Sequence, residues 1–389
     1  MRKYLFHRDT LLATIFVFLV MGLLSLIPLN THILDPIKLA LKDFDYNDLA
    51  YSRMGKNKDV PIDTNIAIVD LGQGQRSEIG AIIGRVLQDN PKVVGVDVHF
   101  NEAREPGSDS VLARFFSGEP RVVHAYKLEG EKNLRPGGFF YKTAASSGYT
   151  NFVAEEGSVI RYFSPRVKND TGWYEAFSTS VIKQANRDRY NELSEREKNA
   201  EMISYVPKEK FHVVDGMALL QDQIEFSFRN KIVLIGLAHE SATSVEDKHF
   251  TPMNQKPFGK SLPDQEGVFI HANIVKMVND GTYISKMPLW LTWLVAVVLC
   301  WLHVAFFLSY FVDRHVWFHL AAKLAQIVSF VLFVYLGLLV FNKFNFKINL
   351  TPALLAIILA VDVIYFYEAI AKWLHIRTSF KTIFTKSHH

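Results

Sequence analysis

Four long apolar runs constrain this 389-residue chain more than any other feature of its sequence. Residues 10–34, 287–312 and 324–342 contain no charged side chain, and a fourth run, 350–374, contains only three. Each run is about as long as the ~20 residues that cross ~30 Å of hydrocarbon as a helix. The alternative is a set of buried helices in a soluble core, which rarely stay uncharged for so long. We therefore predict four transmembrane helices.

These runs divide the chain into four parts. We expect a signal-anchor helix over 1–29, an exported domain over 30–287, three transmembrane helices over 288–374 and a basic tail over 375–389. The first run has a basic start but no small-x-small cleavage site after it, so we expect it to stay uncleaved.

The basic flanks of the runs predict the orientation in the membrane. Arg2, Lys3 and Arg8 precede the first run, which places the N-terminus in the cytoplasm, and four spans return the C-terminus there. Lys343 and Lys347, in the short outer loop, are an exception to this pattern. We predict a multi-pass protein of the bacterial inner membrane with its large domain in the periplasm.

Composition excludes several classes of protein. The balance of 43 basic and 39 acidic residues gives a net charge of +4, too small for a nucleic-acid binder. A hydrophobic content of 49% excludes a disordered chain. Cys300 is the sole cysteine of the sequence, so an intrachain disulfide and Cys₄ or Cys₂His₂ zinc sites are excluded.

The exported segment alternates strand and helix patterns. Short β-branched runs predict strands at 66–71, 92–98, 121–126 and 231–236, and apolar spacing predicts helices at 77–88, 108–116, 173–185 and 267–279. We take Ser77 as the N-cap of the first helix, 148–165 as a hairpin and 187–210 as an exposed loop. Strand–helix–strand units of this size predict an α/β domain with a mainly parallel sheet.

Motifs that would indicate catalysis are absent from the sequence. Gly72-Gln73-Gly74 lacks the third glycine of a dinucleotide fingerprint, because Ser77 stands there, and residues 259–261 lack the first glycine of a phosphate loop. Neither Gly-x-Ser-x-Gly nor His-Glu-x-x-His occurs. We predict no enzyme activity and no cofactor.

Titratable residues nevertheless gather where ligands of open α/β sheets bind, beyond the carboxyl ends of strands. Our candidate ligand-binding residues are Asp70, Asp97, Asp247, His249 and His271. A divalent metal on 239–249 is an alternative, but the spacing matches no established site, so we predict no metal. Capping of the turn after each strand is the alternative role for the two strand-end aspartates.

Three polar residues fall inside the predicted spans. Asp362 lies about 14 Å into the last one, where an ionisable side chain faces protein or water. His303 is out of register with it, and Tyr335 is the better-placed partner. A hydrogen bond between helices and a proton pathway are the two interpretations.

The order of the motifs in the exported segment resembles the second type of CHASE domain, an extracytoplasmic sensory domain of bacterial receptors. The similarity covers roughly 40–285. It is carried by Ile68-Val69-Asp70, Arg76, Pro91 to Asp97, Gly148 to Asn151, Val159 to Arg161, Lys231 to Gly236, Asp247, Thr251-Pro252 and Gly267 to Asn273. One span before and three after match the family's usual arrangement.

The resemblance implies a sensory fold, and such domains normally feed a cytoplasmic cyclase or kinase. Because only 375–389 follows the last span, we expect a non-catalytic subunit whose periplasmic domain docks partners in an envelope complex. The alternative is a sensory module that signals to a separate cytoplasmic effector. Expected partners are the lipid bilayer and other membrane or periplasmic proteins, in a homo- or hetero-oligomer, but no nucleic acid. Apolar residues at helical spacing in 378–384 predict a short tail helix on the inner leaflet or against a partner.

Overall fold

The chain forms two compact units in the computed structural model. One unit comprises residues Asp43–Ile284, and the other comprises Met1–Lys42 with Ser285–His389. The structure describes residues 2–26, 45–72, 74–130, 134–152, 158–170, 172–239, 247–254, 262–313 and 318–385.

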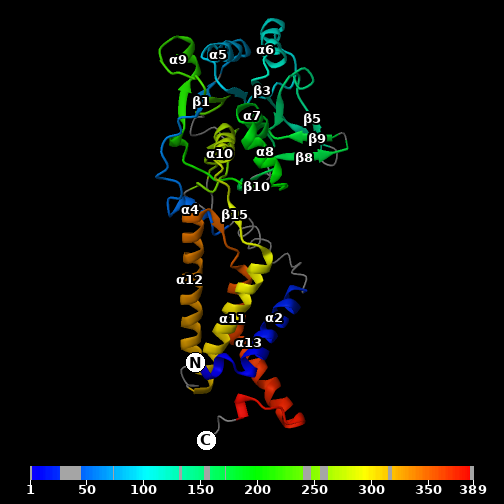
Figure 1. Ribbon diagram of the computed structural model, residues 1–389, viewed down its shortest axis with the longest axis vertical. Coiled ribbons are helices and arrows are strands. Elements are labelled where there is room, and N and C mark those ends of the chain that lie inside the picture. Colours follow the sequence, from blue (N-terminus) through cyan, green and yellow to red (C-terminus); the bar gives the residue numbers. More distant parts are fainter. Residues whose placement is uncertain are drawn as a thin grey trace. The chain divides into compact units, whose positions relative to one another are not determined.

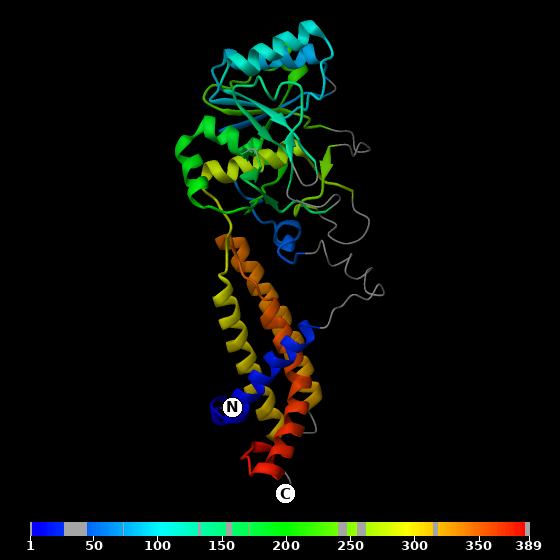
Figure 2. The ribbon, with the colours of Figure 1, turned by 90° about the vertical axis from the view of Figure 1, so that its right-hand side faces the viewer.

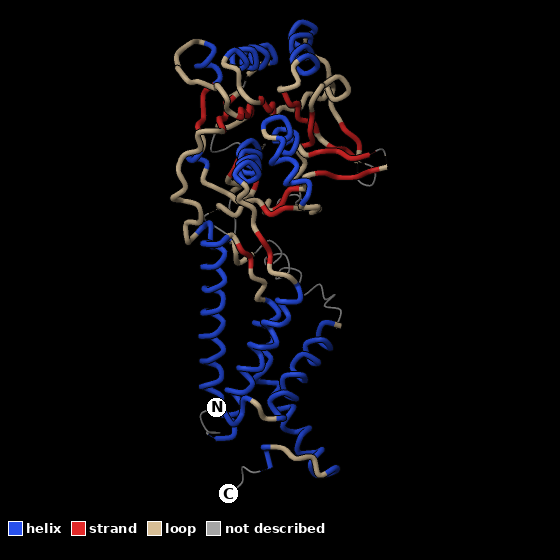
Figure 3. The backbone as a smooth tube through the Cα atoms, in the orientation of Figure 1, coloured by secondary structure: helices blue, strands red, loops and turns tan. Residues whose placement is uncertain are grey.

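A six-stranded parallel sheet forms the centre of the first unit, which we call the α/β unit (Figure 3). Its strand order is β11-β1-β12-β2-β3-β6, and every pairing in it is parallel. The strands are β1 (Ile66–Asp70), β2 (Val93–Val96), β3 (Val122–Tyr126), β6 (Ser147–Tyr149), β11 (His212–Asp215) and β12 (Ile232–Gly236). The predicted α/β class and parallel sheet are therefore confirmed.

Helices cover both faces of this sheet (Figure 1). One layer holds α5 (Arg76–Gln88), α6 (Pro106–Gly118) and α9 (Gly216–Leu220), and the other holds α7 (Phe177–Ala185) and α10 (Gly267–Asp280). Strands covered on both faces need apolar side chains at every position, which explains the continuous β-branched runs in the sequence. Each of the five residues of β12 is buried, as that rule requires.

Several predicted boundaries in this unit are wrong. Helix α5 begins at Arg76 rather than after Ser77, because Glu78 accepts a hydrogen bond from the backbone N–H of Gln75 at 2.6 Å and closes the first turn there. The helix predicted from residue 173 is preceded by β9 (Gly172–Glu175), which pairs with β8 (Arg166–Asn169) and leaves α7 to begin at Phe177.

The middle of the α/β unit also differs from prediction. The segment 148–165 is no simple hairpin, because β6 joins the central sheet while β7 (Tyr162–Phe163) pairs with β10 (Glu201–Met202). The segment 187–210, predicted as a loop, begins with α8 (Arg187–Glu195), whose Leu193 is buried. Packing of this polar helix on α7 and α10 supplies the stability that its own sequence lacks.

The second unit, which we call the helical unit, contains four helices long and apolar enough to cross a membrane. They are α2 (Arg8–Ser25), α11 (Leu289–Asp313), α12 (Phe318–Phe344) and α13 (Thr351–Thr378), and α1 (Arg2–Leu5) precedes them. Figure 2 shows α2 crossing the other three obliquely. Small side chains such as Ala13, Ala356 and Ala360 are buried between the helices, and large apolar ones such as Val328 and Phe366 face outward. This distribution is that of a membrane protein.

The C-terminal tail does not form the predicted amphipathic helix. It contains one 3₁₀ turn, η4 (Ile383–Thr385), and its apolar residues Ile383 and Phe384 are buried in the core of the helical unit. The buried carboxylate of Asp9 holds the turn in place, because it accepts hydrogen bonds from the backbone N–H of Ile383 at 2.8 Å and from the hydroxyl of Thr382 at 3.2 Å. The predicted helix on the inner leaflet is wrong, because these apolar side chains pack against the other helices of the unit and not against lipid.

Candidate functional site

Four of the five predicted ligand residues meet at the carboxyl edge of the sheet. Asp97 directly follows β2, Asp247 and His249 come from the segment around β13 (Lys248–His249), and His271 projects from α10. The imidazole of His249 lies 4.0 Å from the carboxylate of Asp247. Burial and, to a smaller extent, the negative charge of Asp247 raise the pKa of Asp97. We call these residues, with His99, the sheet-edge cluster.

Phe152 joins the two histidines of this cluster. Its ring stacks on that of His271 with 4.9 Å between centroids and meets that of His249 edge-on at 5.1 Å. On its other side His271 is hydrogen-bonded to the hydroxyl of Ser178 at 2.9 Å and contacts the ring of Phe177. The cluster is therefore a partly aromatic site that keeps water away from the imidazole of His271.

Asp70 lies outside the cluster. Its carboxylate accepts hydrogen bonds from the backbone N–H of Ala238 at 2.8 Å and of Gly72 at 3.2 Å, and it lies 2.9 Å from Nδ1 of His239. The alternative role, capping the turn after its strand, is therefore the one that the structure shows. Because β12 lies between β1 and β2, the ends of the two aspartate-bearing strands are not neighbours.

Two further histidines were not predicted from the sequence. His99 lies close enough to lower the pKa of His271 and is hydrogen-bonded through Nε2 to the hydroxyl of Thr150 at 2.7 Å. His124, in the middle of β3, is fully buried among phenylalanine rings and has no hydrogen-bond partner among the described residues. A histidine inside an otherwise apolar strand run was the signal that could have identified it.

Burial changes the protonation of these groups. It lowers the pKa of His99 and of His124 to about 4 and that of His271 to about 3, since a charged imidazole loses its hydration there. It also raises the pKa of Asp97 to about 7, helped by the charge of Asp247 and opposed by that of Lys127. The cluster thus contains neutral imidazoles and a carboxyl group that titrates near neutral pH.

Metal binding finds no support in the described part of the chain, where no group of three or more metal-ligating side chains comes together. Glu240 and Glu246, from the titratable segment 239–249, lie outside the described residues, as do Gln73 and residues 259–261. Gly72 has a left-handed φ of 54°, which agrees with a turn.

The three polar residues of the spans do not form one site. Asp362 lies 3.8 Å from the ammonium group of Lys323 on α12, and Tyr335 is exposed, so the expected pairing of Asp362 with Tyr335 is wrong. His303 is instead hydrogen-bonded to the hydroxyl of Ser329 at 2.8 Å. Lys323 directly precedes the uncharged run 324–342 and lies within α12, which begins at Phe318.

Acidification should destabilise the α/β unit. The buried histidines His99, His124 and His271 have folded pKa values below their ordinary 6.5, so the unfolded chain binds more protons and stability is lost as pH falls from 6.5 towards 4. Asp97 acts the other way. Its raised pKa contributes stability that is present below the ordinary pKa of 3.8 and is lost as pH rises through about 7. Asp264, whose pKa burial raises to about 6, acts in the same direction as Asp97. The three histidines outweigh the two carboxyl groups, so the net effect is loss of stability in acid.

The variant Asp97→Asn tests the contribution of the Asp97 carboxyl group to the pH dependence of stability. It should be more stable than the wild type above pH 7, by about 1 kcal/mol or more, and this advantage should shrink as the pH falls. The measurement is the thermal unfolding midpoint of the full chain in detergent across pH. Asp170→Asn, at an exposed carboxyl group, is the control and should follow the wild type. Identical pH profiles for Asp97→Asn and the wild type would contradict the assigned pKa.

Together these observations define a membrane protein with one large α/β domain and a partly buried, ionisable cluster at its sheet edge. The profile of the CHASE2 domain family matches residues 17–310, most of the chain. The protein therefore belongs to this family of sensory domains, which confirms the resemblance stated from the motifs.

A curated protein, the tRNA-2-methylthio-N(6)-dimethylallyladenosine synthase of Geobacter sulfurreducens (strain ATCC 51573 / DSM 12127 / PCA), is 28% identical over 150 residues. The similarity covers 34% of this chain and 32% of that synthase, so the chain spans about a third of that protein's length. No solved structure matches the chain.

Proposed function

We propose that this protein is a non-catalytic sensory module of the bacterial inner membrane. Its α/β unit lies in the periplasm, both termini lie in the cytoplasm, and it passes the state of the sheet-edge cluster to a partner protein through the helical unit. Membership of the CHASE2 family and four membrane-length helices support this proposal.

The burial and the position of helix α10 are the main structural support for the sensory function. This helix is the most buried one of the α/β unit, since eleven of its fourteen residues are buried, and it contributes His271 to the cluster. The helix ends at Gly281 in a left-handed cap, and α11 begins at Leu289. A change in the cluster that moves α10 therefore reaches the first residue of a membrane helix through a very short connection.

A serine–histidine pair beside the sheet-edge cluster supports a role without catalysis. Ser178 and His271 are hydrogen-bonded, as a nucleophile and its base would be, but their exposed fractions are only 1% and 4%. A nucleophile must reach its substrate, and a hydroxyl group buried at the start of α7 cannot. We therefore assign this pair to the packing of α7 on α10.

Docking of a partner in an envelope complex is the second candidate function. The β8–β9 hairpin presents Trp173 with an exposed fraction of 56%, and the guanidinium group of Arg166 lies over its ring at 4.6 Å. Exposed tryptophan and arginine side chains are frequent energetic centres of protein interfaces. In that case Trp173→Ala should abolish co-purification of a periplasmic partner in mild detergent.

Reporter fusions test the orientation on which both functions depend. A fusion at Ser108 should report the periplasm and a fusion at His389 the cytoplasm, because basic residues flank the first and last helices on one side. A cytoplasmic signal at Ser108 would contradict the sensory and the docking function together.

The sensory function predicts that the helical unit responds to the cluster. Amide hydrogen exchange of α11 should change when the pH crosses the Asp97 pKa of about 7, and a flexible glycine–serine insertion between Thr282 and Pro288 should remove that response. Asp97→Asn should remove it as well, while Asp170→Asn should leave it intact. A response that survives both changes would rule out coupling through α10.

A further inference from the structure

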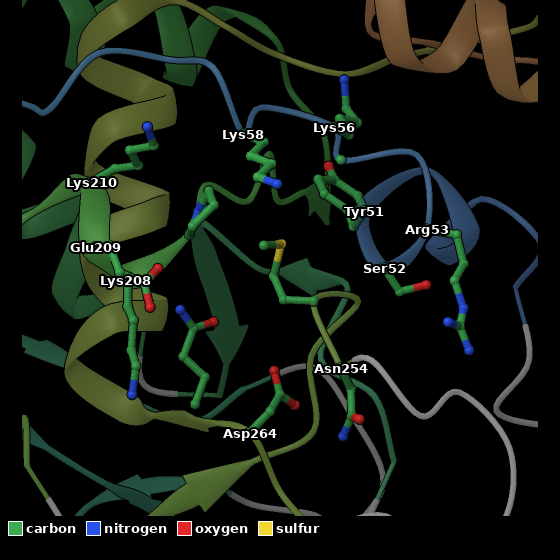
Figure 4. A pocket seen from close by; sticks show the side chains of 14 residues that line it. Tyr51, Ser52, Arg53, Lys56, Lys58, Lys208, Glu209, Lys210, Asn254 and Asp264 are labelled. Carbon is green, nitrogen blue, oxygen red and sulfur yellow. The ribbon is translucent and has the colours of Figure 1, made fainter.

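A basic cleft in the α/β unit belongs to none of the sites described above. It has a volume of about 670 Å³ and lies where α4 (Asp48–Ser52), the turn that follows it, η2 (Lys208–Lys210) and the segment around Asp264 come together (Figure 4). This volume is within the range of pockets that hold small organic ligands. Its lining contains five cationic side chains, from Arg53, Lys56, Lys58, Lys208 and Lys210, and two acidic ones, from Glu209 and Asp264.

The walls of the cleft are held by contacts that do not need a ligand. The carboxylate of Asp48, on α4, forms an ion pair with Arg161 at 2.5 Å, and both side chains are largely buried. The ring of Tyr51 packs edge-on against that of Tyr205. The amide group of Asn57 donates a hydrogen bond to the backbone carbonyl of Tyr205 at 2.6 Å. This bond fixes the turn that contains Lys56 and Lys58.

The opposite wall is tied to the same frame. The backbone N–H of Asp63 donates to the carbonyl of Lys210 at 2.8 Å, and this bond anchors the end of η2. The left-handed φ of 66° at Gly55 turns the chain between Lys56 and Arg53 so that both line the cleft. Positive side chains from two separate parts of the chain are therefore brought together on preformed backbone.

The electrostatic balance of the lining favours an anion. Lys56 is almost completely buried, and burial lowers the pKa of its ammonium group to about 8, so a nearby negative charge stabilises its charged form. Asp264 does not offset the excess charge fully, because its carboxylate is engaged by the backbone N–H and the hydroxyl of Thr251 at 2.8 and 2.5 Å. Burial also raises the pKa of Asp264 to about 6.

A neutral side chain in the lining indicates that the ligand carries a hydroxyl group as well as a negative charge. Gln265 has an exposed fraction of 3%, and its Oε1 atom has no hydrogen-bond partner among the described residues. A buried carbonyl oxygen left without a donor is unfavourable, and a hydroxyl group entering the cleft would supply the donor. The lining thus combines an excess of cations with an acceptor for a hydroxyl group.

We propose that this cleft binds a small hydroxylated phosphate ester, such as a phosphoglycerol group. Lys58 and Lys208 would contact the phosphate oxygens, and Gln265 would accept a hydrogen bond from a hydroxyl group. The same chemistry occurs in a free sugar or glycerol phosphate and in the headgroup of phosphatidylglycerol. The inference does not depend on the sensory or the docking function, because it rests on different residues.

The test is titration calorimetry on the full chain in phosphatidylcholine nanodiscs, with glycerol 3-phosphate and inorganic phosphate as probes. The double variant Lys58→Gln/Lys208→Gln should weaken binding of glycerol 3-phosphate about tenfold or more, since both lysines donate charge-assisted hydrogen bonds. The matched control is Lys92→Gln/Lys142→Gln, at exposed lysines of the same unit, and it should bind like the wild type. Gln265→Met should remove the preference for glycerol 3-phosphate over inorganic phosphate.

Nanodiscs that contain phosphatidylglycerol distinguish the two sources of the ligand. Weaker apparent binding of glycerol 3-phosphate in them would show that the lipid headgroup occupies the cleft, and equal binding would assign it to a free ester. Both results support the proposal. It is overturned if neither probe binds the wild type in either membrane, or if the double variant and its control bind alike.

Discussion

Replacing Gly148 with alanine should unfold the α/β unit under conditions in which the wild type stays folded. Gly148 lies in β6, and a Cβ atom there would stand 2.5 Å from Cα and 2.6 Å from the backbone nitrogen of Phe177, at the start of α7. Backbone atoms cannot move aside as a flexible side chain can. We expect a loss of about 3 kcal/mol or more, at the upper end of what overpacking costs.

Gly118→Ala is the matched control for this prediction. A Cβ atom at Gly118, the last residue of α6, meets nothing within 4 Å, so the change should be neutral or slightly stabilising. The measurement is the thermal unfolding midpoint of each full-length variant in the same detergent. A midpoint for Gly148→Ala equal to that of Gly118→Ala would show that α7 does not pack on β6 as described.

Replacing Asp9 with alanine should release the C-terminal tail from the helical unit. The buried carboxylate accepts hydrogen bonds from the Tyr367 hydroxyl at 2.7 Å, from the Thr382 hydroxyl and from the backbone N–H of Ile383. Without it three donors would stay buried and unsatisfied, at about 1–3 kcal/mol each in the closed state. Detachment of the tail lets those donors reach water and is therefore the favoured outcome.

Limited trypsin digestion measures this release. Cleavage after Lys381 should become about tenfold faster or more in Asp9→Ala, because it follows the population of the detached tail. Asp362→Asn is the control, since it changes a carboxylate of the same unit that pairs with Lys323 and not with the tail. Unchanged cleavage in Asp9→Ala would mean that the apolar contacts of Ile383 and Phe384 hold the tail by themselves.

The strands of the sheet show where sequence patterns were sufficient. β1, β2, β3 and β12 were predicted because strands covered on both faces are continuously apolar, and that pattern is visible without any partner. The place of β6 in this sheet was not predicted, because its residues were assigned to a separate hairpin, and β11 was missed. The first is three residues long and contains Gly148, and the second follows a polar segment, so both become strands through pairing with β3 and β1 respectively.

For the candidate site, too, local patterns were sufficient for some residues and not for others. Asp97, Asp247, His249 and His271 were selected as ligand candidates because ligands of open α/β sheets bind beyond the carboxyl ends of the strands, and these four residues lie together in the structure. Asp70 was selected by the same argument but lies outside this group and caps the turn after its strand, because β12 separates β1 from β2. Strand order depends on crossover connections that no local pattern specifies.

By itself the sequence determined the two kinds of structure in this protein, the four membrane-length helices and the parallel α/β domain, because both follow from local hydrophobic periodicity. The tertiary structure alone decided which polar groups meet. It paired Asp362 with Lys323, buried Asp9 under the tail, and collected Arg53, Lys58 and Lys208 around one cleft. The physical reason is that a side chain's charge and hydrogen bonds depend on neighbours that lie far away along the chain. Periodicity reports only whether a side chain is buried, not which group it meets there.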